Sequence, residues 1–134
     1  MRKIFYLAVL ISLFGGGAAF AHHSFAMFDQ AKVLTLQGTV KEWQWTNPHA
    51  WLTVEAASPG RPEVQSWSIE GGSLQTLRRG GFTRDAVKPG DKIIVTIHPR
   101  RDGAAGGALM AVTTADGRVM GRPGETGPAQ GDGN

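Results

Sequence analysis

Two adjacent histidines, His22 and His23, are the residues of this chain whose type and position most directly suggest chemistry. They follow Ala19-Phe20-Ala21, which has the small residues of a secretory cleavage site. Cleavage after Ala21 would leave a free amine on His22. That amine and the Nδ1 atom of the same histidine can form a chelate ring, and nitrogen ligands in tetragonal geometry favour Cu(II). Both donors must be deprotonated, so we expect binding to weaken in mild acid.

The segment ahead of the histidines has the composition of an export signal. Arg2 and Lys3 give a positive start, an apolar run covers residues 4–14, and three glycines then break it. The run is shorter than the roughly 20 residues that a membrane-spanning helix needs. We therefore expect residues 1–21 to be a cleaved signal peptide, with an uncleaved anchor as the alternative. The mature protein is expected to be periplasmic or secreted, without a stable membrane span.

The composition of the mature chain limits the classes of function. Residues 22–134 are enough for one small domain, and the absence of cysteine means that no disulfide stabilises it. Arg2 and Lys3 leave with the signal, so 12 basic residues remain against 11 acidic ones, a formal net charge of +1. This near-neutral balance argues against nucleic acid as a partner.

The elements that must position these residues follow from hydrophobic periodicity. After an arm over residues 22–32, alternating apolar residues predict strands near residues 34–45, 49–57, 64–70, 92–98 and 108–114. The apolar face changes phase within the first strand, which indicates a β-bulge near Lys41-Glu42. Ser73 is a helix cap, Leu74 and Leu77 share one face of a short helix, and residues 82–87 are expected to form another helical turn. A hairpin into residues 118–120 is a further expectation.

Three strands, a short helix and two more strands match the order of the OB-fold, a mainly β, five-stranded Greek-key barrel. The alternative is an open antiparallel sandwich of the same strands. The predicted domains are the signal at 1–21, the arm at 22–32, the barrel at 33–120 and a disordered Gly- and Pro-rich tail at 121–134.

Several motifs resemble those of one known family. They are His22-His23-Ser24-Phe25-Ala26-Met27-Phe28-Asp29, the run from Gly38 to Trp51, Ile69-Glu70-Gly71-Gly72-Ser73, Leu77-Arg78-Arg79-Gly80, Lys88-Pro89-Gly90-Asp91-Lys92 and His98-Pro99-Arg100-Arg101-Asp102-Gly103. Together they are similar to a family of small secreted bacterial proteins described as domain of unknown function 6152. The resemblance covers nearly all of residues 22–118 and implies an exported single-domain protein. It implies no activity and no ligand.

Two further histidines, His49 and His98, are candidate metal ligands. In an OB barrel the fourth strand pairs with the first, so His98 should lie where the arm enters the barrel. His49 starts the second strand and is expected at the other end. The predicted metal set for Cu(II) or Zn(II) is therefore His22, His23 and His98, with His49 a weaker candidate and Met27 and Asp29 as additional donors. The alternative is that these histidines are solvated or make ordinary hydrogen bonds.

A second candidate site is a groove on the face formed by the first three strands. Its predicted residues are Trp43, Trp45, Trp51, Trp67, Arg100 and Arg101. Aromatic and arginine side chains suit stacking on sugars or contact with a partner protein. The alternative is that the tryptophans fill the core. No nucleophile elbow, phosphate loop or paired carboxylates occur in the sequence, so we expect a non-catalytic binding or accessory protein, including one that delivers metal to another periplasmic protein.

Overall fold

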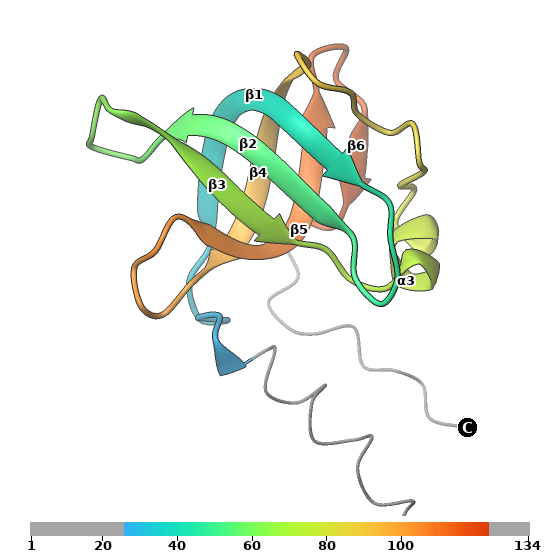
Figure 1. The fold of residues 1–134 in the computed structure, drawn as a ribbon, viewed down its shortest axis with the longest axis horizontal. Helices are drawn as coiled ribbons and strands as arrows, with labels where there is room; N and C mark the ends of the chain where they lie inside the picture. Colours follow the sequence, from blue (N-terminus) through green and yellow to red (C-terminus); the bar gives the residue numbers. More distant parts are fainter. Residues whose placement is uncertain (1–25, 124–134) are drawn as a thin grey trace, which may run out of the picture.

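The computed structural model describes residues 26–123 as one sheet of six strands and one short helix (Figure 1). In chain order the elements are β1 (Leu34–Gln44), β2 (Trp51–Ala57), β3 (Val64–Glu70), α3 (Leu74–Arg79), β4 (Lys92–Pro99), β5 (Gly106–Thr114) and β6 (Val119–Gly121). None of the helices in residues 26–123 has the length and apolar character to span a membrane.

The first five strands close into a barrel. Four antiparallel pairings give the order β3-β2-β1-β4-β5, and a parallel pairing of β3 with β5 joins the two ends. The parallel contact is short, running from Ser68 against Gly106 to Glu70 against Ala108. This is the OB-like topology expected from the element order, and closure excludes the open sandwich.

Strand β1 is long because it contributes to both halves of the barrel. Its register against β2 shifts between Val40 and Glu42, which confirms the predicted bulge. The bulge explains how apolar residues before and after it both reach the interior: Leu36 and Val40 are buried on one side of it, and Trp45 is buried beyond it. Gly38 allows β2 to approach closely, since a Cβ atom there would lie 2.5 Å from the carbonyl oxygen of Glu55.

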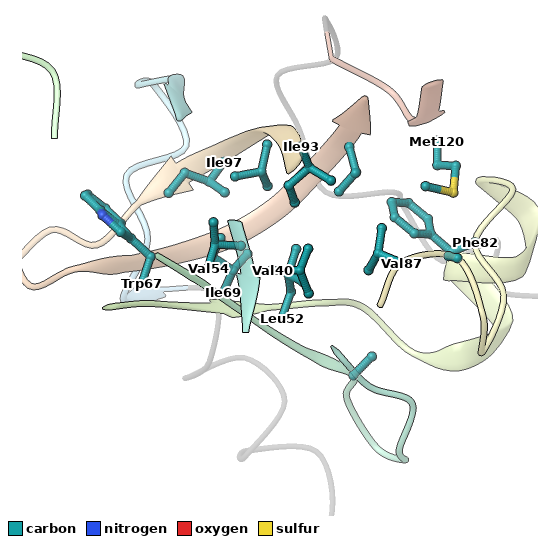
Figure 2. Close-up of a cluster of buried hydrophobic side chains, with 14 of the residues drawn as sticks. Val40, Leu52, Val54, Trp67, Ile69, Phe82, Val87, Ile93, Ile97 and Met120 are labelled. Carbon is teal, nitrogen blue, oxygen red and sulfur yellow. The ribbon is translucent and has the colours of Figure 1, made fainter. Parts of the chain in front are cut away.

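The short helix begins where the sequence predicts. Ser73 is its N-cap, and its hydroxyl accepts a hydrogen bond from the N–H of Thr76 at 3.2 Å. The predicted helical turn at residues 82–87 is instead a hydrogen-bonded turn, with the N–H of Ala86 donating to the Thr83 carbonyl. Figure 2 shows Phe82, Val87 and Met120 packed at one end of the core and Trp67 at the other.

Strand β5 meets two different partners along one edge. Its first residues pair with β3, and residues 111–113 pair with the short strand β6, which confirms the predicted hairpin. The N–H of Ser68 donates to the Ala105 carbonyl at 3.2 Å. Because backbone groups alternate along a strand, those of Val64 and Ser66 point to the same side, where β3 has no paired strand in the part of the chain described. Val64 is 66% exposed at this edge.

Candidate functional site

The arm that leads into the barrel is fixed by main-chain hydrogen bonds. The N–H of Asp29 donates to the Pro99 carbonyl at 2.8 Å, and the N–H of Arg101 donates to the Met27 carbonyl at 2.9 Å. Between them Phe28 forms an antiparallel bridge with Arg100 and buries its ring to 3% exposure. The guanidinium of Arg101 also donates to the Ala26 carbonyl. The chain that follows His22 and His23 is therefore held against the end of β4.

His98 lies at this end of β4, as the topology argument expected. Its neighbour Ile97 pairs with Leu34 at the start of β1. The imidazole is 7% exposed, and its Nδ1 atom lies 2.8 Å from the carbonyl oxygen of Lys32, at the end of the arm. With Nδ1–H donating to that carbonyl, only Nε2 is available as a metal ligand. His22 and His23 lie outside the described residues.

His49 makes different contacts at the loop before β2. Its Nδ1 atom lies 3.2 Å from Oε1 of Glu70 and 3.3 Å from the carbonyl oxygen of Gly71. Glu70 is opposite Trp51 in β2 and opposite Ala108 in β5, and Ala108 is opposite His98. Three strand spacings, about 14 Å, therefore separate Trp51 and His98 along this row. Within residues 26–123, no three His, Cys, Asp or Glu residues come together as a metal site.

The four tryptophans have three different environments. Trp45 and Trp67 are core residues with 8% and 6% exposure, and the indole of Trp67 donates to the Ala56 carbonyl at 3.2 Å. Trp43 packs against Trp45 and Phe82 and donates to the Thr83 carbonyl at 3.1 Å. Trp51 is 37% exposed. The structure thus does not present the four indoles as one groove.

Trp51 instead borders a small pocket of about 130 Å³ beside the arm. The lining combines Met27 and Phe28 of the arm, Trp51 of β2, Glu70 of β3, and Arg100 and Ala105 at the β4–β5 loop. These strands and this loop form the face on which OB-folds bind ligands. The sequence reasoning missed Glu70 as a site residue, because only the β3–β5 contact brings it beside the arm.

A second, larger groove of about 580 Å³ lies away from the arm. It covers Gly38, Ala56 and Ile93, with Val64 and Thr114 also in its lining. Its lining residues include no histidine, tryptophan or arginine. None of the predicted site residues therefore lies in it.

The charges near the small pocket are largely paired. The guanidinium of Arg100 contacts the carboxylate of Asp102 at 2.5 and 3.0 Å. Asp29 accepts hydrogen bonds from the Ala31 N–H and lies 3.3 Å from Nζ of Lys32. Burial raises the pKa of Asp29, but these hydrogen bonds and the charges of Lys32 and Arg101 outweigh it and lower the pKa. Asp29 thus acts in the structure as an anchor of the arm.

The Arg100–Asp102 contact predicts a pH effect on stability. The hydrogen bonds from Arg100 lower the pKa of Asp102 from 3.8 to about 2. Because the folded-state pKa is the lower one, the contact stabilises the fold above pH 4 and is lost as the pH falls from about 4 to about 2. We expect the free energy of unfolding of the wild type to exceed that of Asp102→Asn at pH 5, with the difference vanishing near pH 2 in denaturant titrations. A difference that is independent of pH would contradict this assignment.

The fold and site together define a small OB-like barrel with an N-terminal arm fixed beside its ligand-binding face. The chain belongs to the family of unknown function DUF6152, whose family model matches residues 9–110. The matched range includes His22 and His23 and ends within β5. No curated protein and no solved structure gave a significant match.

Proposed function

We propose that this chain is an exported, non-catalytic binding or accessory protein whose mature N-terminus binds Cu(II) or Zn(II). The ligands are the free amine and imidazole of His22 together with the imidazole of His23. His98 is the third imidazole in the arrangement suggested by the sequence, and it would join through Nε2. Delivery of the bound metal to another periplasmic protein is compatible with the same chemistry.

The observation that carries this proposal is the fixation of residues 26–29 to the end of β4. A chelating N-terminus on a freely moving arm would lose conformational entropy on binding metal, and a fixed arm reduces that cost. His22 precedes Ala26 by four residues, so covalent geometry limits the distance between their Cα atoms to about 14 Å. The metal would therefore be held near the pocket between the arm and the barrel.

The test is a Cu(II) titration of the exported protein, followed by calorimetry and EPR. Mass spectrometry first establishes that the chain begins at His22. We expect one equivalent of Cu(II) to bind with nitrogen ligation and with affinity that falls as the pH is lowered through the histidine range. A dissociation constant weaker than about 0.1 mM, roughly 5 kcal/mol of binding free energy, would contradict the proposal.

A second candidate function is recognition of a glycan or partner protein at the β2–β3 face. The observation that favours it is the exposed indole of Trp51 beside Arg100 at the small pocket. An exposed indole can stack on a sugar ring or bury against a partner side chain. We expect a binding glycan to shift the tryptophan fluorescence of the wild type but not of Trp51→Phe. A panel of cell-wall glycans that leaves the wild-type emission unchanged would count against this function.

A further inference from the structure

Glu70 is a carboxylate held in an enclosed position at the end of β3. Its side chain is only 10% exposed, and it lines the small pocket together with Met27 of the arm and Trp51 of β2. Removing a carboxylate from water costs free energy unless positive or hydrogen-bonding partners surround it. A metal ion is such a partner, and a carboxylate oxygen is a suitable ligand for Cu(II) or Zn(II).

His49 is placed to orient this carboxylate. Its Nδ1 atom lies 3.2 Å from Oε1 of Glu70, and the same nitrogen lies 3.3 Å from the carbonyl oxygen of Gly71. Ligating carboxylates in metal sites are themselves held by hydrogen bonds of this kind. A carboxylate can accept several partners at once, so the contact with His49 is compatible with metal ligation.

The pocket lies within reach of the proposed N-terminal ligands. Met27 lines it, and His23 precedes Met27 by four residues in the chain. Its volume of about 130 Å³ is close to the roughly 150 Å³ of a cavity that holds one benzene ring, so it can accommodate one imidazole. His98 is less suitable, because its ring is 7% exposed and its Nδ1 atom already binds the end of the arm at Lys32.

We propose that Glu70 is the ligand that the barrel supplies to the N-terminal metal, with His49 as the positioning residue for its carboxylate. The amine and imidazoles of the mature N-terminus then provide the nitrogen ligands, and His98 serves to fasten the arm. This inference rests on the proposed metal-binding function and names a ligand that the sequence did not suggest.

The experiment is Cu(II) titration and EPR of the processed full-length protein and of matched variants. Glu70→Gln keeps the size of the side chain but removes the charge, and we expect it to weaken Cu(II) binding at least tenfold and to change the copper hyperfine splitting. Glu55→Gln is the control, because it removes the same charge from a surface ion pair with Lys41. We expect that control and His98→Gln to stay within threefold of the wild type. His49→Gln should give a smaller loss than Glu70→Gln.

The possible outcomes separate this inference from the proposed function. Copper binding by the wild type that Glu70→Gln and Glu55→Gln affect equally would overturn Glu70 as the ligand and leave the N-terminal site standing. A larger loss in His98→Gln than in Glu70→Gln would overturn it in favour of His98. Failure of the wild type to bind copper would remove both. If thermal melting shows that Glu70→Gln is unfolded, Glu70→Asp provides the same test with the charge retained, and an unaltered hyperfine splitting in that variant would overturn the assignment.

Discussion

Replacing both leading histidines, in the double variant His22→Ala/His23→Ala, is expected to weaken Cu(II) binding by the mature protein at least about 100-fold. The double variant keeps the terminal amine but removes both imidazoles that the proposed site depends on. A 100-fold loss corresponds to about 2.7 kcal/mol of binding free energy. Isothermal titration calorimetry at pH 7.5 measures it directly. Both residues should be changed together, because an imidazole at the second position can also chelate copper with the amine.

A second variant separates the amine from the imidazoles. Two alanines added ahead of His22 retain both rings but move the amine away from the first of them, and we expect the affinity to fall and the EPR spectrum to change. The unfolding transition should be the same in all three proteins, since the histidines precede the described fold. A double variant whose affinity is within threefold of the wild type would sink the N-terminal site.

Replacing Gly121 with alanine is expected to lower the free energy of unfolding by about 3 kcal/mol or more. Gly121 lies in β6 with a φ of +81°, and its N–H donates to the Gly80 carbonyl at 2.8 Å. A Cβ atom at this position would collide with the carbonyl oxygen of Met110. Backbone strain contributes about 1–3 kcal/mol and overpacking a similar amount. For a domain of this size the midpoint of thermal unfolding should fall by about 12 °C or more.

Gly117→Ala is the matched control for this prediction. Gly117 has a φ of +87° in the turn between β5 and β6, but a Cβ atom there would meet nothing within 4 Å. Its cost should be limited to the left-handed backbone conformation, about 1–2 kcal/mol. Differential scanning calorimetry of both variants isolates the steric contribution of the contact with Met110. Equal destabilisation of the two would show that β6 yields without cost.

The local features of the fold could be predicted because each depends on neighbouring residues. A change of apolar phase within a single strand is enough to reveal the bulge after Val40, and a hydroxyl ahead of an apolar i,i+3 pair is enough to place the cap at Ser73. The order of strands and helix then fixed the barrel class through known topology. The turn at residues 82–87 was misjudged as helical because its apolar residues pack individually into the end of the barrel.

The site could be predicted only in part, since it depends on contacts between distant segments. The position of His98 beside the arm followed from strand pairing, but the hydrogen bond to Lys32 that occupies Nδ1 did not. The exposure of each tryptophan depends on what packs over it: Trp43 is covered by residues about 40 positions later, whereas Trp51 is not. Glu70 became visible as a site residue only when β5 was placed beside β3.

The unpaired side of β3 has a consequence for the behaviour of this protein in concentrated solution. A strand with unsatisfied main-chain groups can recruit the same strand of another molecule and start ordered aggregates. Pro62 and Glu63 directly precede Val64, and they interrupt that surface with a residue that lacks an N–H and with a negative charge. These are the means by which natural sheets discourage edge-to-edge assembly. The two residues thus protect the colloidal stability of a barrel whose seam closes over only three residue pairs.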